Sequence, residues 1–229
     1  MKKWYVILIL LLTVTFTGCS KLTVKFGDDE NIQLKDDNKD KTSKEQKLSS
    51  VEYPDDSYEP LEVSDEFIVA YNNFTKKVVK EIFVEKNNQF FSPISLYFAI
   101  AMLAEWISDE DALEEVEALL GLSIDIAREE LKKIYQNNYY DTEFGRAYLA
   151  NSIWYDYKLD INSEYTKLLQ TSYYAESYKI NFANADDKKK IVDWINYYTE
   201  NLLNLTPENY PIPDDIVLML INTIFYNSK

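Results

Sequence analysis

The chain has 229 residues, of which 46% are hydrophobic, and it carries a formal net charge of −15 at pH 7. This length and hydrophobic content suffice for one domain with a sizeable core. A surface with so large a negative charge repels phosphate backbones, which argues against nucleic acids as partners.

The residue types that the chain lacks exclude several classes of enzyme. It has no histidine, so neither a Ser-His-Asp triad nor a Cys-His pair can form, and the usual zinc sites lose a main ligand. Only four glycines are present, and none of them forms a phosphate-binding loop. We therefore expect that the chain is not an enzyme and has no catalytic residue, metal or cofactor.

Residues 1–18 are typical of a secretory signal. Lys2 and Lys3 precede an apolar run, Trp4–Leu12, that is too short to cross a bilayer as a mature helix. Gly18 then stands before Cys19, the only cysteine, as in the cleavage box that this segment resembles, that of bacterial lipoproteins. We expect a lipid on Cys19 and a membrane-anchored location on the extracellular side of the cell. An ordinary cleaved signal with an incidental cysteine is the alternative.

Residues 19–62 differ in composition from the rest of the chain. They are rich in charged and polar residues and contain few large apolar side chains, so they cannot bury enough surface to offset the entropy cost of ordering. Asp36, Asn38 and Asp40 are spaced as at the start of a calcium loop, but Lys41 and Lys47 stand where that loop needs glycine and glutamate. We predict a disordered tether without a metal site.

Residues 63–229 show the patterns of a folded domain. Apolar residues that recur at steps of three and four are typical of amphipathic helices, and continuous apolar runs indicate buried strands. These patterns predict helices at residues 65–86, 94–107, 111–120, 126–136, 163–177 and 191–205, and strands at 146–155, 178–182 and 216–226. Helices come early and strands late, so the predicted fold class is α+β.

Three polar residues stand in apolar surroundings. Ser92 and Ser95 lie at the start of a helix that should be buried, and Asn222 interrupts the last apolar strand. A buried amide without a partner costs about 1–3 kcal/mol, so Asn222 should have one. From these residues alone, Ser92 is a helix cap and Asn222 is a satisfied core amide.

Three stretches of this domain resemble motifs of the serpins, a family of suicide protease inhibitors. They are Phe91-Ser92-Pro93-Ile94-Ser95 before an alanine-containing helix, Ala150-Asn151-Ser152-Ile153-Trp154, and Val217–Tyr226 with Asn222 inside it. The resemblance covers residues 67–229. The segment Glu105–Asp109 departs from it, because the family has a glycine-containing turn there.

The resemblance implies a serpin-like α+β fold, with N-terminal helices packed on part of a large sheet that is incomplete at the C-terminus. It implies that Ser92, Ser95 and Asn222 lie in a hydrogen-bond cluster under the point where the middle strands of that sheet part. In the family, a histidine from the second half completes this cluster. The implied partner is an extracellular serine, or sometimes cysteine, protease.

The resemblance also implies a mechanism. In serpins the protease cuts an exposed bait loop, which then inserts as a new strand into the main sheet. That loop would follow Lys229, so we expect no reactive bond in the printed chain, no inhibition by it alone, and an apolar, aggregation-prone edge at residues 216–226. The alternative is a non-inhibitory surface-binding lipoprotein or the product of a decayed gene.

Overall fold

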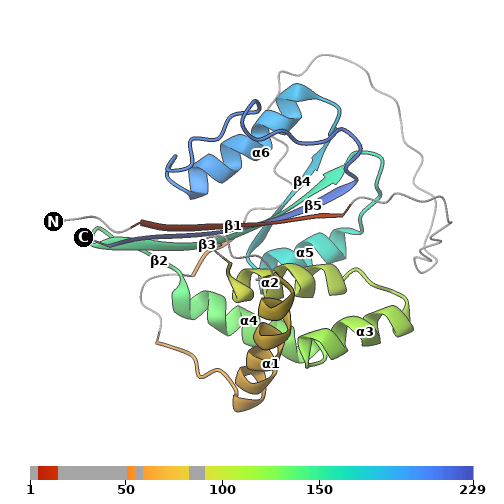
Figure 1. Ribbon diagram of the computed structural model, residues 1–229, viewed down its shortest axis with the longest axis vertical. Coiled ribbons are helices and arrows are strands. Elements are labelled where there is room, and N and C mark those ends of the chain that lie inside the picture. Colours follow the sequence, from red (N-terminus) through yellow and green to blue (C-terminus); the bar gives the residue numbers. More distant parts are fainter. Residues whose placement is uncertain (1–4, 15–50, 55–58, 83–90, 229) are drawn as a thin grey trace.

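The computed structural model describes residues 5–14, 51–54, 59–82 and 91–228. In this part of the chain the helices are α1 (Asp65–Ile82), α2 (Pro93–Ala104), α3 (Glu110–Leu120), α4 (Ile124–Asn138), α5 (Ser163–Ser172) and α6 (Ala185–Tyr198). The strands are β1 (Tyr5–Val14), β2 (Tyr140–Asp141), β3 (Gly145–Asp156), β4 (Ala175–Ile180) and β5 (Leu218–Ser228). Helices α1 to α5 lie on one face of a single sheet and α6 lies on the other (Figure 1). The predicted α+β fold class is confirmed.

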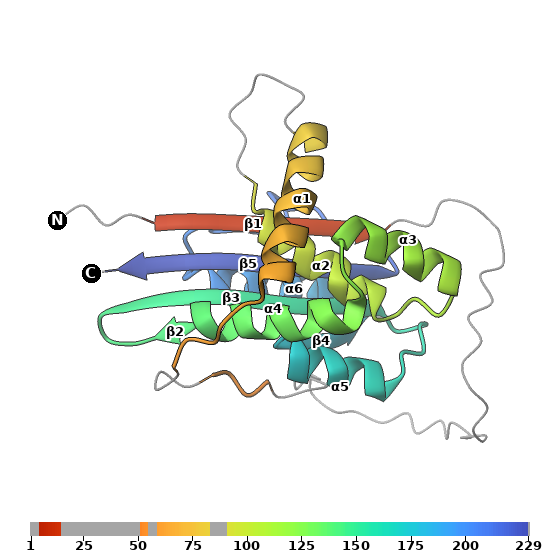
Figure 2. The ribbon, with the colours of Figure 1, turned by 90° about the horizontal axis from the view of Figure 1, so that it is seen from below.

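Strands β3 and β5 lie at the centre of the sheet. Strand β5 pairs antiparallel with β3 on one side and with β1 on the other (Figure 2). Strand β4 pairs parallel with the C-terminal half of β3, and the short β2 pairs with its N-terminal end. The register sets Asn222 of β5 opposite Asn151 of β3, so two polar residues meet inside an apolar sheet.

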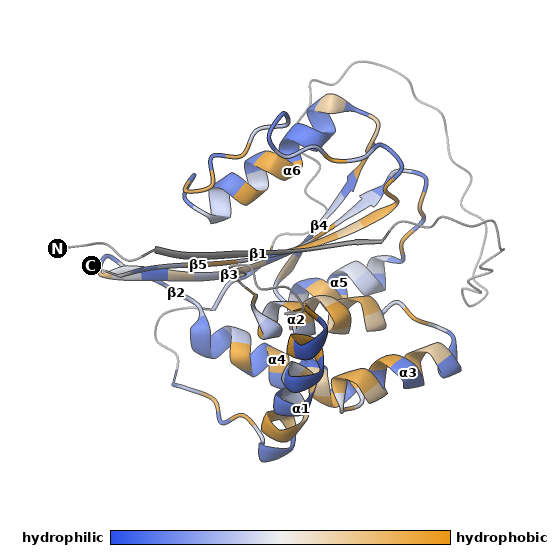
Figure 3. Cartoon of the chain, in the orientation of Figure 1, coloured by the Kyte–Doolittle hydropathy of each residue, from blue (hydrophilic) through white to orange (hydrophobic). Residues whose placement is uncertain are grey.

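Each face of the sheet carries its own apolar core. Between the sheet and α6, Trp154 and Ile221 pack with Trp194 and Ile195, all of them buried. On the opposite face α2 is apolar on most sides, as its central position requires. By contrast, α4 on that face and α6 on the first face each show one apolar and one polar side (Figure 3). The buried faces therefore fix the two layers on the sheet.

The ends of several elements differ from the sequence prediction: α6 begins at Ala185 rather than at 191, and β4 spans Ala175–Ile180 rather than 178–182. The helix predicted to continue to residue 177 ends at Ser172, because Tyr174 adopts a left-handed backbone conformation with φ 51° and the strand β4 begins directly after it. The helix predicted to end at residue 205 ends at Tyr198, because Glu200 and Asn201 are also left-handed. Tyr174 and Glu200 belong to residue types that rarely adopt this conformation, so no local pattern predicted their turns, whereas Asn201 belongs to a type that adopts it more often.

The chain just before α1 is docked on the domain. The amide of Leu61 donates to Asn137 Oδ1 at 2.7 Å, and Asn137 Nδ2 donates back to the Leu61 carbonyl at 2.8 Å. Val51 and Tyr53 are half-buried against the core. The prediction of a disordered tether therefore does not hold for residues 51–54 and 59–62. Its remainder, and Cys19, lie outside the described residues.

The edge of β5 is occupied. The expectation of an open edge at residues 216–226 is wrong for the described structure, because β1 pairs with β5 from Tyr5 opposite Asn227 to Val14 opposite Leu218. The segment Tyr5–Val14 is aliphatic and β-branched, which suits a strand, and an open edge is a template for such a strand. The signal interpretation of residues 1–18 stays a prediction. Within the described ranges no helix is long and apolar enough to cross a bilayer.

Gly121 ends α3 and permits a close approach to α1. Its φ is +81°, and a Cβ atom there would lie 3.1 Å from the Cβ of Ala70. We expect Gly121→Ala to lower the free energy of unfolding by about 1–2 kcal/mol, because a side chain in the left-handed region is strained and the contact is tight. Urea unfolding measures the change. The matched control is Ser123→Ala, since Ser123 is exposed and its side chain makes no capping bond; equal midpoints for the two variants would contradict the prediction.

Candidate functional site

The three polar residues singled out in the sequence lie where α2 meets the sheet. Ser92 is the N-cap of α2, and its Oγ accepts a hydrogen bond from the amide of Ser95 at 3.2 Å. Pro93 follows at the first helical position, where a missing N–H costs nothing. Helix α2 packs against β5, the strand that carries Asn222. Ser92 therefore has the capping role that its sequence position indicates.

Asn222 is bonded to the neighbouring strand through its side chain. Its Nδ2 donates to Asn151 Oδ1 at 2.5 Å, and Asn151 Nδ2 donates to the carbonyl of Tyr173 at 2.8 Å. Both asparagines are 1% exposed. The two amides thus link β5, β3 and the turn that precedes β4. Asn151 was not predicted as a site residue, because the sequence does not reveal the strand register that sets it opposite Asn222.

The structure does not join the two serines to Asn222. Ser95 Oγ and Asn222 Oδ1 are both buried and have no hydrogen-bond partner among the described residues. Ser92, Ser95 and Asn222 were expected in one hydrogen-bond cluster, but among the described residues no direct hydrogen bond joins either serine to Asn222. Buried polar atoms without partners are unusual in proteins, so these two atoms mark the place where further polar groups fit.

The bond between Asn151 and Asn222 gives a testable prediction. We expect Asn222→Ala to lower the free energy of unfolding by about 1–3 kcal/mol, because the acceptor on Asn151 is then left buried without its donor. In a double-mutant cycle with Asn151→Ala, urea unfolding should give a coupling energy of about 1 kcal/mol or more. Strictly additive effects of the two substitutions would show that the bond contributes nothing.

A second buried polar group fastens α6 to the sheet. Glu176 of β4 is 2% exposed and accepts hydrogen bonds from Trp194 Nε1 at 2.6 Å and from the Tyr198 hydroxyl at 3.1 Å, both on α6. The Tyr178 hydroxyl donates to the same carboxylate at 2.6 Å. Burial, together with nearby Tyr53 and the negative charge of Glu176, raises the pKa of Tyr198 far above its usual value, so its hydroxyl stays a donor. No sequence motif indicated this cluster.

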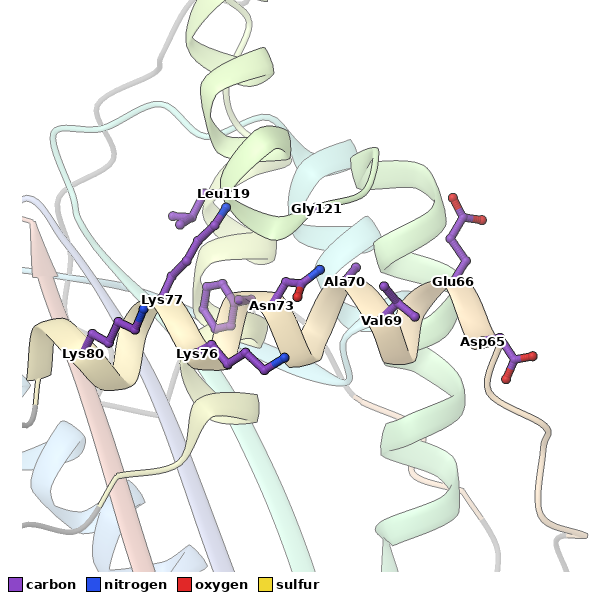
Figure 4. Close-up of a pocket in the computed structure, with 11 residues that line it drawn as sticks. Asp65, Glu66, Val69, Ala70, Asn73, Lys76, Lys77, Lys80, Leu119 and Gly121 are labelled. Atoms are coloured by element: carbon purple, nitrogen blue, oxygen red, sulfur yellow. The ribbon is translucent and has the colours of Figure 1, made fainter.

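An open groove of about 670 Å³ runs along α1 (Figure 4). Asp65 and Glu66 lie at one end of it and Lys76, Lys77 and Lys80 toward the other, with an apolar floor between them. The remaining lining residues are Val69, Ala70, Asn73, Phe74, Leu119 and Gly121. None of these groups forms a nucleophile–base pair. Across the described residues no group of three or more His, Cys, Asp and Glu side chains is placed to hold a metal ion.

The arrangement combines main-chain strand pairing with buried side-chain contacts on both faces of the sheet. A central strand, β5, is held to β3 by main-chain bonds and by one pair of buried amides, while α2 supports it from one face and α6 covers it from the other. What such a site can do is accept or release a neighbouring strand along the outer side of β5, where β1 lies in this structure.

Comparisons with known proteins point to one family. The family model described as "Serpin (serine protease inhibitor)" matches residues 69–229. Similar proteins include Serpin-Z2A of Oryza sativa subsp. japonica, 29% identical over 67% of this chain and 38% of its own length. Alpha-1-antiproteinase S of Cavia porcellus is 26% identical over 62% of this chain and 36% of its own length. The chain thus spans less than half the length of these relatives.

Solved structures of low sequence identity share the fold. The thermophilic serpin tengpin in its latent state superposes with a TM-score of 0.63 at 22% identity, over 75% of this chain and 46% of that one. A loop C-sheet serpin polymer gives a TM-score of 0.63 at 22% identity, over 79% of this chain and 47% of that one. Both are similar in the arrangement of the helices on the sheet.

Proposed function

Because this chain belongs to the serpin family, we propose that the protein to which it contributes inhibits serine endopeptidases on the extracellular side of a cell membrane. Serpins are generally protease inhibitors rather than enzymes, and the absence of histidine from the sequence agrees with a non-enzymatic role. The observation that supports the proposal best is that the outer edge of β5 pairs with an added strand, here β1, which belongs to the segment that the lipoprotein processing proposed below removes. Strand β1, distant in the sequence, pairs antiparallel with β5 along 10 residues.

The proposed mechanism uses the sheet as the acceptor of a cleaved loop. A protease attacks a bait loop and forms an acyl-enzyme bond, and the loop then adds to the sheet as a strand and carries the bound protease with it. In this chain β5 supplies the main-chain donors and acceptors for the added strand. Asn151 and Asn222 keep β5 attached to β3 during that addition, and α2 supports β5 from below.

The location is proposed from the sequence of the first 19 residues. A lipid on Cys19, followed by the predicted tether, would hold the folded domain outside the membrane and within reach of extracellular serine, or cysteine, proteases. Labelling cells with a fatty acid tests this, with Cys19→Ala as the control. A Cys19→Ala protein that still takes up label would refute lipid attachment at this residue.

The inhibitory function is tested with the complete protein and with residues 1–229 alone. We expect the complete protein to form slow, detergent-stable complexes with at least one member of a panel of trypsin-like, chymotrypsin-like, elastase-like and subtilisin-like proteases. We expect residues 1–229 to form none, because the relatives are more than twice as long as the part matched here. A complete protein that is only degraded by every protease would overturn the inhibitory function.

A further inference from the structure

Tyr53 is held by three separate elements of the domain. Its ring stacks on Tyr139, which follows α4, with ring centroids 5.2 Å apart and an interplanar angle of 8°. Its hydroxyl lies 2.7 Å from the hydroxyl of Tyr198, the last residue of α6, and 3.5 Å from Glu176 Oε1 of β4. The segment 51–54 therefore reaches both helical layers and the edge of the sheet between them.

The direction of the hydrogen bonds follows from the proton count. The Tyr198 hydroxyl has one proton and donates it to Glu176 at 3.1 Å, so the short contact between the two hydroxyls uses the proton of Tyr53. Tyr53, Tyr198 and Glu176 then form a chain that ends on a buried carboxylate, and each bond in such a chain strengthens the next. Burial and the charge of Glu176 raise the pKa of Tyr53 well above its usual range, so this proton is retained.

The stacking partner of Tyr53 is itself fixed. Tyr139 stacks on Tyr135 with centroids 5.9 Å apart, and Tyr135 stacks on Tyr174 at 4.2 Å, in the turn that leads into β4. A second attachment follows a few residues later, where Leu61 and Asn137 exchange two hydrogen bonds. The segment before α1 is thus attached to α4 and to Tyr139 just after it, and Tyr53 contacts the C-terminal end of α6 through Tyr198.

We propose that residues 51–54 act as a latch that holds the C-terminal end of α6 on the sheet. Tyr53 makes the holding contacts, with Tyr139 and with Tyr198. Helix α6 covers Met219 and Ile221 of β5, so its attachment limits how far the sheet can rearrange at β5. Loss of the Tyr53 contacts releases the latch and loosens α6. Under the function proposed above, which this inference extends, the N-terminal segment then regulates the acceptance of a strand.

The experiment is hydrogen exchange on the full chain, resolved for the amides of α6 and of α2. We expect Tyr53→Ala to speed exchange at the C-terminal end of α6 by about tenfold while α2 is unchanged, because one hydrogen bond and one ring stack are lost. Tyr53→Phe keeps the stack and loses the hydroxyl, so a smaller acceleration is expected. The control is Tyr157→Ala, since Tyr157 is 50% exposed and the Lys158 ammonium lies over its ring, 5.3 Å from the centroid.

Two outcomes would overturn the latch. One is exchange in α6 that matches the unsubstituted chain in both Tyr53 variants. The other is an acceleration of exchange that is equal in α6 and α2, since this would show general destabilisation. If Tyr53→Ala does not fold, the same comparison is made with Tyr53→Phe, the milder change. Exchange is measured without any protease. If the protein inhibits no protease but exchange in α6 is faster in the Tyr53 variants, the proposed function is refuted and the latch is supported.

Discussion

Replacing Glu105 with alanine is expected to lower the free energy of unfolding by about 3 kcal/mol. The Glu105 side chain is 4% exposed and accepts two hydrogen bonds from Arg128, from Nε at 2.6 Å and from Nη2 at 2.8 Å. The Tyr173 hydroxyl donates to the same carboxylate at 2.6 Å. The substitution removes the acceptor from both donors and leaves the guanidinium, which is 19% exposed, largely buried without its main partner.

The neighbouring carboxylate provides a control for this prediction. Asp125 also lies 2.9 Å from Arg128, but its side chain is 82% exposed, so Asp125→Ala should cost less than about 1 kcal/mol. The hydrogen bonds that Arg128 donates to Glu105 raise the pKa of Arg128 above its usual value, so the guanidinium stays charged in the unsubstituted protein. Urea unfolding of both variants is the measurement. Equal decreases in the free energy of unfolding for Glu105→Ala and Asp125→Ala would show that burial of the Glu105–Arg128 pair does not increase its contribution to stability.

Tyr97→Ala should have a still larger effect, a loss of about 3–5 kcal/mol in the free energy of unfolding. Tyr97 of α2 is fully buried, and its ring meets Phe67 and Phe74 of α1 edge-on, with centroids 5.4 Å and 5.0 Å apart. Its hydroxyl donates to the carbonyl of Leu120, at the end of α3, at 3.0 Å. Truncation therefore opens a cavity at the junction of three helices and removes a hydrogen bond.

Two further variants separate these contributions. Tyr97→Phe keeps the ring and should cost about 1 kcal/mol, the net value of one hydrogen bond. Tyr197→Ala removes a tyrosine that is 73% exposed and should change the unfolding free energy by less than about 0.5 kcal/mol. All three are compared by urea or thermal unfolding of the same chain. A Tyr97→Ala protein as stable as Tyr197→Ala would contradict the described packing.

The sequence predicted most elements but not the contacts that join them. The periodic apolar residues located α1 to α6, and Gly121 marked the end of α3, because these features act within one turn of helix. The left-handed Tyr174 and the register that brings Asn151 opposite Asn222 depend on residues distant in the sequence. No local pattern encodes them, so they had to come from the structure.

Glu105 shows how a departure from a family pattern can be read. The sequence analysis noted that Glu105–Asp109 replaces a glycine-containing turn, without a reason for it. In the structure Glu105 ends α2 and binds Arg128 of α4 and Tyr173 after α5. The replacement supplies a buried carboxylate that ties three segments together. Its partners could not be predicted, because no sequence pattern indicates that an arginine of α4 and a tyrosine after α5 bind this carboxylate.

The side chain of Asn151 has a consequence for how the sheet deforms. Its Oδ1 accepts a hydrogen bond from Asn222 of β5 and its Nδ2 donates one to the carbonyl of Tyr173, just before β4, so one amide group links three adjacent segments. Separating β3 from β5 and separating β3 from β4 are therefore not independent events. We infer that these three strands translate as a single plate, and that any shear within the sheet is confined to the far border of β5.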